Sequence, residues 1–286
     1  MAADILNEEI SNDRESVREQ SHAEIEYCVL DPTGNITILV TTPVPVELQP
    51  RIAAELMRII PESEQVGFLT HDDSCDIALR MAGGEFCGNA SMSAAVYAAG
   101  KAGAVKSEIV LRVSGSEEPI RAEVEKMSDG SWTGTVNMPR PAKIERVVLP
   151  GAGSVPVVCF EGIHHVILEE KIEEARAEEY ARMWCRELAA DAIGLMFLDR
   201  ANAKLTPLVY VPSADTICWE NSCASGTTAA VAYLASESGA PVRMTLSQPG
   251  GGLTVEVSED GIPRLQGHVR ILHYGRTVVT YSSGNL

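Results

Sequence analysis

One segment of the sequence occurs twice, at an interval of 223 − 87 = 136 residues. Residues 87–104 read CGNASMSAAVYAAGKAGA, and residues 223–240 read CASGTTAAVAYLASESGA. Each copy begins with a cysteine, continues through small residues into an alanine-rich stretch, and ends in Gly-Ala. The interval is far longer than the roughly 20–50 residues of a solenoid unit, so the repeat predicts two similar domains related by a pseudo-twofold axis.

The small residues that follow each cysteine are expected to form the first turn of a helix. A helix N-terminus presents unpaired backbone N–H groups and a partial positive charge, which favour a thiolate over a thiol. Two such cysteines on facing helices could act as base and acid on one carbon, because inversion of a stereocentre needs a proton removed on one face and delivered on the other. Either segment alone is also compatible with close helix packing, but the matched pair favours a catalytic role for Cys87 and Cys223.

Composition narrows the classes of function. The chain has 286 residues, of which 45% are hydrophobic, so it can bury a substantial core. Its formal net charge of -17, without a basic run, argues against nucleic acid or an anionic membrane surface as partner. No stretch approaches the roughly 18–20 apolar residues of a membrane span, and the N-terminus lacks the layout of a signal peptide. These features predict a cytoplasmic protein.

The cysteines and histidines indicate neither a disulfide framework nor a metal site. Seven cysteines are an odd number, and none of them are spaced as CxxC, so reduced thiols are expected. The six histidines include no HExxH-like spacing, so a bound metal has no support. The five cysteines outside the repeat lack its context and are interpreted as structural.

The remaining pattern predicts an α+β fold. A strand is expected at 36–40, where apolar residues alternate, and a helix between Pro50 and Pro61. Further strands are expected at 107–113, 119–126 and 132–138, within 155–169, and at 252–258, 268–274 and 277–282. A second helix is expected over 171–189, with a face made of Ile172, Ala175, Tyr180, Met183 and Trp184. Strands that follow one another in series favour a largely antiparallel sheet.

Two segments are interpreted as boundaries. Residues 1–26 contain eight acidic residues against Arg14 and Arg18, with few large apolar side chains, and are expected to form a solvated tail. Pro139 and Pro141 follow the predicted meander and mark the candidate boundary between the two domains.

From about residue 27 onwards the chain resembles the diaminopimelate epimerase family, the pyridoxal-phosphate-independent amino-acid racemases that include proline racemase. The resemblance rests on motifs spread along the sequence. They are Gly34-Asn35 before an apolar strand, Gln65 before Val66, Cys87-Gly88-Asn89, Gly162-Ile163-His164-His165, Cys223-Ala224-Ser225-Gly226, and 248-QPGGGLTVEV-257 followed by Gly267.

The resemblance implies two pseudo-symmetric domains, each a mixed, mostly antiparallel sheet wrapped around a central helix, with the active site in the cleft between them. It implies reduced catalytic cysteines, no metal or organic cofactor, and a possible homodimer. The last strands are expected to cross back, which divides the chain into 27–139 plus 267–286 and 140–266. The implied substrate-binding residues are Asn35, Gln65, Gly88, Asn89, His165, Ala224, Ser225 and Gly226; Glu220, three residues before Cys223, is expected to border the site.

Departures from the family pattern concern the distal part of the substrate. Diaminopimelate epimerases carry a Glu-Arg-Gly element whose arginine binds the distal carboxylate, whereas residues 211–223 read VPSADTICWENSC and contain no arginine. A bidentate arginine site is hard to replace, so diaminopimelate is disfavoured as substrate. Family members dedicated to histidine show the same loss, and Glu64 or Glu220 could meet an imidazole. Both glutamates could equally be surface carboxylates, and His165 could be a structural histidine.

The sequence therefore favours a cofactor-independent amino-acid racemase or epimerase that inverts Cα between two thiols, with histidine as the candidate substrate. Three alternatives stay open at this point. These are a diaminopimelate epimerase, an isomerase of the same fold, and a non-catalytic protein that binds a small amino acid. The isomerases and phenazine-type enzymes of this fold lack the cysteine pair, and a binding protein has no need of it.

Overall fold

A computed structural model describes residues 20–282 of the chain. The predicted acidic tail lies outside the described residues up to position 19. Its last part is not a tail, however, because Gln20–Pro32 form strand β1, which pairs antiparallel with the end of the chain over Gln20↔Ser282 to Pro32↔Val269. Ile25 is buried between Glu24 and Glu26, both of which are exposed. The partner of this strand is some 250 residues away, so the acidic composition concealed it.

The first half of the described chain runs from β1 to β7. Its elements are β1 (Gln20–Pro32), β2 (Thr37–Val40), η1 (Val46–Leu48), α1 (Gln49–Ile59), β3 (Gln65–Thr70), β4 (Ile77–Met81), α2 (Gly88–Lys101), β5 (Lys106–Val113), β6 (Ile120–Lys126) and β7 (Trp132–Asn137). Helix α1 begins beside Pro50 and ends before Pro61, as the sequence predicted.

The second half contains the remaining elements. They are β8 (Lys143–Leu149), β9 (Gly153–Phe160), β10 (Ile163–Leu168), α3 (Glu174–Glu187), β11 (Ile193–Asp199), β12 (Lys204–Val211), η2 (Pro212–Ala214), β13 (Thr216–Trp219), α4 (Ala224–Ser238), β14 (Val242–Gln248), β15 (Gly251–Val257) and β16 (Pro263–Ser282). The two closing strands that the sequence predicted are one continuous strand, β16.

The face assigned to the helix over 171–189 was partly wrong. Helix α3 buries Ala177, Tyr180, Ala181, Trp184 and Cys185, whereas Ala175 is exposed. The helix begins three residues later than predicted. Its buried face includes Tyr180 and Trp184, whose rings are stacked with their centroids 4.5 Å apart.

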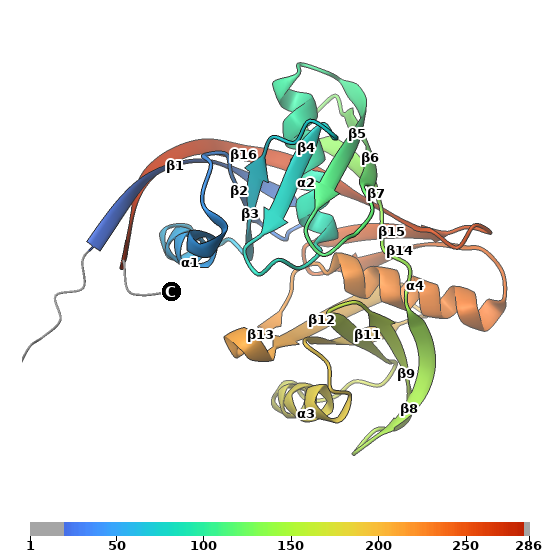
Figure 1. Cartoon of the computed structure of the whole chain (residues 1–286). Helices are drawn as coiled ribbons and strands as arrows, with labels where there is room; N and C mark the ends of the chain where they lie inside the picture. The colour runs from blue at the N-terminus through green and yellow to red at the C-terminus, as the bar shows by residue number, and fades with distance from the viewer. Residues whose placement is uncertain (1–19, 283–286) are drawn as a thin grey trace, which may run out of the picture.

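The two halves repeat the same order of strand pairings. In the first half, β2 and β3 are parallel across α1, and β4 and β5 are parallel across α2. In the second half, β10 and β11 are parallel across α3, and β12 and β14 are parallel across α4. The other strand pairs are antiparallel. The fold is therefore α+β with two pseudo-symmetric halves, each a mixed, mostly antiparallel sheet (Figure 1).

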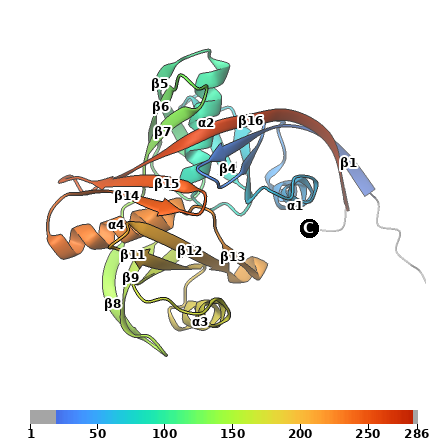
Figure 2. The same ribbon diagram turned by 180° about the vertical axis from the view of Figure 1, so that it is seen from behind.

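The two halves are connected by the chain between β7 and β8 and by the pairing of β16 with strands of both halves. Strand β7 continues, after the break at Pro139 and Pro141, into β8, which pairs with β9 of the second half. Strand β16 pairs at its start with β15 and β7 and at its end with β1 (Figure 2). On these pairings we propose the division into 27–139 plus 267–286 and 140–266, with the strand residues from Gln20 added to the first part.

Helices α2 and α4 lie inside the two sheets. Most residues on every side of both helices are buried, which requires the small Ala, Ser, Thr and Gly side chains of the repeat. A single apolar core surrounds both helices and includes Met92, Ala230, Leu111 and Val255. The repeated segment thus forms the centre of each half.

Gly34 permits a close approach between the halves at the turn before β2, and substituting it should destabilise the protein. Its φ is +87°, and a Cβ there would overlap the Cα of Gly250, in the turn between β14 and β15. We expect Gly34→Ala to lower the melting temperature by several degrees, because left-handed strain of roughly 1–3 kcal/mol is added to the overlap.

Gly103→Ala is the matched control, because Gly103 has φ +71° but nothing lies within 4 Å of an added Cβ. The control should show the backbone strain alone. Equal melting temperatures for the two variants would show that the contact with Gly250 is not a constraint.

Candidate active site

Cys87 and Cys223 occupy the N-cap positions of α2 and α4. Both have extended backbone conformations, with φ/ψ of −136°/115° and −120°/110°. The Sγ of Cys87 accepts a hydrogen bond from the N–H of Ala90, and the Sγ of Cys223 accepts one from the N–H of Gly226, both at 3.4 Å. The predicted helix starts are confirmed, and each sulfur takes the place that a serine or aspartate oxygen fills at an ordinary N-cap.

The N-termini of the two helices meet. A Cβ placed on Gly88 would lie 3.0 Å from the Cβ of Ala224, and the Nδ2 of Asn89 donates to the backbone oxygen of Ser222 at 3.3 Å. Because Gly88 has no side chain, the two first turns can come this close. The structure therefore brings both cysteines to one junction between the halves, with the first-turn N–H groups beside them.

A chain of polar side chains leads from Cys87 to the other half. The Cys87 thiol donates to Gln65 Oε1 at 2.9 Å, and Gln65 Nε2 donates to Asn35 Oδ1. Asn35 Nδ2 donates to Glu64, whose other carboxylate oxygen accepts from Asn221 Nδ2 at 2.7 Å. Asn221 precedes Cys223 by two residues, so the hydrogen bonds of Glu64 link the two halves near the start of α4.

Cys223 has a different set of neighbours. Its Sγ lies 3.6 Å from Ser225 Oγ, which in turn lies 3.0 Å from His165 Nε2. The Glu220 side chain interacts with the Cys223 thiol. The backbone N–H of Cys223 donates to Gln248 Oε1 at 2.9 Å, which fixes the cysteine against the end of β14.

In the free protein, burial has a larger effect on the pKa of the two thiols than the helix N-termini have. Burial raises the pKa of Cys87 to about 12, against the opposing hydrogen bond from the Ala90 N–H, and Glu85 and Glu220 raise it further. Burial also raises the pKa of Cys223, and the neighbouring Glu220 adds to the shift. The expectation that the helix N-terminus favours a thiolate is therefore wrong for the free protein, because desolvation and nearby carboxylates exceed the effect of one N–H group.

The two glutamates are not ordinary surface carboxylates. Burial raises the pKa of Glu220 to about 7, and the charge of Glu64 contributes in the same direction. Burial is also the main cause of the raised pKa of Glu64, against hydrogen bonds from Asn221 and Asn35. Glu220 can therefore exchange a proton near neutral pH, and its side chain interacts with the Cys223 thiol.

His165 is fully buried, and burial lowers its pKa to about 3, so the imidazole is neutral. Its ring occupies the space left by Gly194 on β11, where a Cβ would overlap Nδ1. The glycine is what allows a histidine to reach Ser225 beside Cys223.

The predicted site residues gather around the two cysteines. Asn35, Gln65, Gly88 and Asn89 lie by Cys87, and His165, Glu220, Ala224, Ser225 and Gly226 lie by Cys223. Their roles toward a substrate stay predictions. Sequence reasoning did not single out Thr37, whose hydroxyl accepts from Gln65 Nε2, or Asn221 or Gln248 as site residues. Gln248 stood only at the start of the 248-QPGGGLTVEV-257 motif, and no motif marked the other two.

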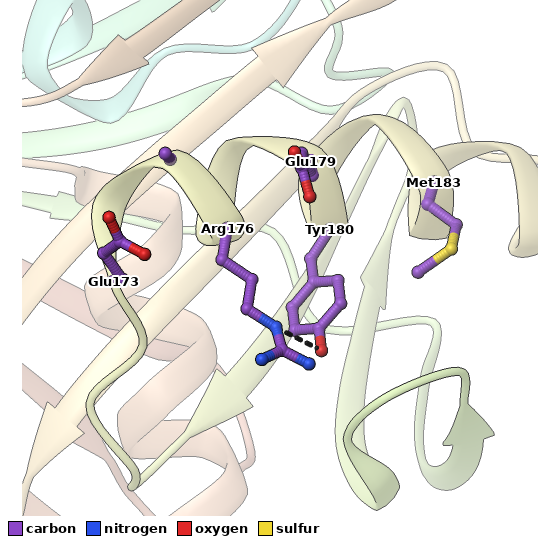
Figure 3. Close-up of a pocket in the computed structure, with 6 residues that line it drawn as sticks. Glu173, Arg176, Glu179, Tyr180 and Met183 are labelled. Atoms are coloured by element: carbon purple, nitrogen blue, oxygen red, sulfur yellow. Dashed lines mark hydrogen bonds between the residues drawn. The ribbon is translucent and has the colours of Figure 1, made fainter.

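Other features of the described residues do not point to a second site of this kind. The pocket of Figure 3 lies along α3, is lined by Glu173, Ala175, Arg176, Glu179, Tyr180 and Met183, and includes none of the predicted site residues. Within residues 20–282, no group of three or more His, Cys, Asp or Glu side chains is placed to hold a metal ion. Over the same residues, no helix combines the length and apolar character needed to cross a bilayer.

Comparison with solved structures identifies the class of the fold. A hydroxyproline epimerase from Agrobacterium vitis superposes with a TM-score of 0.66 at 12% identity, over 90% of this chain and 93% of that one. At that identity the likeness concerns the fold alone, which this chain shares with that epimerase.

Sequence comparison then identifies the family. Residues 24–277 match the family model described as histidine racemase CntK N-terminal domain, and the chain belongs to this family. A histidine racemase from Fusobacterium nucleatum is 29% identical over 264 residues, covering 89% of this chain and 97% of that protein. One from Staphylococcus aureus is 28% identical over 245 residues, covering 81% and 88%. The chain is accordingly an amino-acid racemase, an isomerase.

Proposed function

We propose that this racemase interconverts L- and D-histidine, using Cys87 and Cys223 as its two acid–base groups. The observation that carries the proposal is the meeting of two N-capping cysteines at one junction, with the half-buried carboxylates Glu64 and Glu220 beside them. The relatives that match along most of the chain are histidine racemases, which supports histidine as the substrate.

In this mechanism the substrate carboxylate binds the free N–H groups of the first turns of α2 and α4. Anions are favoured there by the helix dipole and the unpaired donors, and the same donors stabilise the charge that develops when the α-proton leaves. One cysteine, as thiolate, removes that proton, and the thiol on the other face supplies a new one. Glu220 accepts the proton that Cys223 must lose, since it lies beside this thiol and its pKa is near neutrality.

We assign the imidazole to Glu64. The Glu64 oxygens accept from the side chains of Asn35 and Asn221, and the two oxygens of a carboxylate can together accept about four hydrogen bonds. An imidazole N–H is a suitable donor, whereas a distal carboxylate would be repelled. The absence of arginine from residues 211–223 agrees with a substrate that has no second carboxylate.

The test is proton NMR of the reduced protein in D₂O with single L-amino acids, including histidine and diaminopimelate. We expect the α-proton signal of histidine to disappear and D-histidine to accumulate, with diaminopimelate unchanged. Exchange confined to another amino acid would correct the substrate. No exchange with any of them, while both thiols titrate as free, would favour a same-fold isomerase or a binding protein.

Location and assembly remain predictions. A cytoplasmic location is supported by the need for two reduced cysteines, since disulfides form in oxidising compartments. A homodimer is implied by the family resemblance, and sedimentation of the purified protein would test it.

A further inference from the structure

Cys87 faces an oxygen and not an amino group of Gln65. The thiol lies 2.9 Å from Gln65 Oε1. A carbonyl oxygen can only accept, so this contact is a hydrogen bond when the sulfur carries its proton and a repulsion when it does not. The orientation of one amide therefore bears on which cysteine starts as the proton donor.

Two acceptors set that orientation. Gln65 Nε2 donates to Asn35 Oδ1 and, at 2.7 Å, to Thr37 Oγ1. The Thr37 hydroxyl proton is committed to the backbone oxygen of Asn35 at 3.0 Å, and Asn35 Nδ2 is committed to the Glu64 carboxylate. Both branches end in groups that only accept, so the hydrogen bonds run in one direction, from Cys87 to Glu64. A flipped Gln65 amide would place oxygen against oxygen at both partners.

The second half has no such arrangement. The strand register pairs Thr37 with Gln65 in the first half and His165 with Gly194 in the second, so a glycine stands where Gln65 would be. Both sulfurs accept a first-turn N–H, from Ala90 at Cys87 and from Gly226 at Cys223. Cys223 has in addition the Ser225 hydroxyl, which can donate to a thiolate. Its other neighbour is Glu220, which can accept a proton.

We propose that Gln65, oriented by Asn35 and Thr37, is a positioning residue that keeps Cys87 as the proton-bearing thiol of the resting enzyme, so that Cys223 is the base of the first turnover. The assignment rests on the proposed two-thiol racemisation. In that turnover the Cys223 proton passes to Glu220, the Cys223 thiolate takes the α-proton, and the Cys87 S–H proton is delivered to the opposite face. Cys87 is left as the thiolate, and the reverse reaction or exchange with solvent restores the resting state.

The direct test is the pH dependence of iodoacetamide alkylation at Cys87, followed by peptide mass spectrometry without substrate. We expect Gln65→Met to lower the midpoint by about one pH unit, since it removes a hydrogen bond that exists only for the thiol. Gln65→Glu should raise it, because a carboxylate repels the thiolate more strongly. The carboxylates of Glu85 and Glu220, which also act on Cys87, are the same in both variants.

The matched control is Gln266→Met, the same substitution on β16, where the glutamine accepts from Arg243. Its midpoint should equal that of the wild-type protein. If Gln65→Met raises the midpoint or leaves it unchanged, the amide oxygen does not hold the thiol and the assignment is wrong.

Two further measurements use the wild-type protein and therefore do not depend on whether a variant folds. Nuclear Overhauser contacts from the Gln65 side-chain amide protons should reach the Thr37 methyl group, and contacts to the Cys87 methylene group instead would overturn the assignment. Single-turnover reactions with enzyme in excess should be faster for one enantiomer, and equal rates would contradict an unequal resting state. Steady-state kcat/KM cannot serve, because the equilibrium constant of racemisation forces it to be the same for both enantiomers.

The alkylation and NMR results do not depend on the reaction. If they agree with the assignment while no amino acid racemises, the proposed function fails and the hydrogen-bond polarity stands. If racemisation is observed and Cys87 is not held as the thiol, only the further inference fails.

Discussion

Replacing either Cys87 or Cys223 with serine is expected to abolish racemisation of histidine. A hydroxyl is far too weak an acid–base group to act in place of a thiol here, and loss of a general acid or base typically reduces rates by about 10²–10⁴-fold. Each N-cap should survive, because a serine oxygen can accept from the N–H of Ala90 or Gly226. The variants should therefore fold, and the measurement is formation of D-histidine from L-histidine.

The exchange behaviour of each single variant should differ from that of a protein that has simply lost substrate binding. With one thiol remaining, a proton can still be removed and returned on the same face, so each variant should exchange the α-proton of one enantiomer with D₂O and leave the other unlabelled. Cys75→Ser is the control, since Cys75 is a free cysteine in the turn before β4 that contacts Asp72. Racemisation at the wild-type rate in Cys87→Ser would remove that residue from the mechanism.

The second large effect concerns Glu220 and pH. Burial raises the pKa of this carboxyl to about 7, and a protonated Glu220 cannot accept the Cys223 proton. The kcat/KM for racemisation, which reports the free enzyme, should fall about tenfold per pH unit below pH 7, because the ionised base becomes the minor form. The Glu220→Gln variant should be slower by about 10²-fold at pH 8 and should lack this acidic limb.

The substrate imidazole titrates in the same pH range. The Glu220→Gln variant therefore shows whether the acidic limb comes from Glu220 or from the substrate. An acidic limb that persists unchanged in Glu220→Gln belongs to the substrate and would contradict a base role for Glu220. Glu259→Gln, which changes a glutamate in the turn between β15 and β16, provides the control for the loss of one carboxylate.

Much of the fold could be predicted because its signals are local. The start of α1 at Pro50, the strand alternation in β5, β6 and β7, and the small residues after Cys87 and Cys223 act within a few positions of the chain. The first residues of β1 were assigned to a solvated tail and β16 was divided in two, because these strands stabilise each other across some 250 residues. Neither segment contains a signal of its partner.

The candidate site was partly predictable for the same reason. Motifs around both cysteines and the resemblance to a known family named the residues, but nothing in the sequence showed that Gln65 contacts Cys87 or that Gln248 holds the Cys223 N–H. The sign of the thiol pKa shift was also predicted wrongly, because a helix N-terminus can be identified from sequence and desolvation cannot.

The repeat is written in consecutive residues, so two equivalent helices with a cysteine at each N-terminus could be predicted from it. The difference between the surroundings of the two cysteines arises only from the folded arrangement of the chain. Cys87 faces the neutral amide oxygen of Gln65, which is oriented by a chain of hydrogen bonds that leads to Glu64. Cys223 faces Glu220 and Ser225. These contacts join strands and loops of both halves, and their hydrogen-bond polarity and burial exist only once the chain is folded.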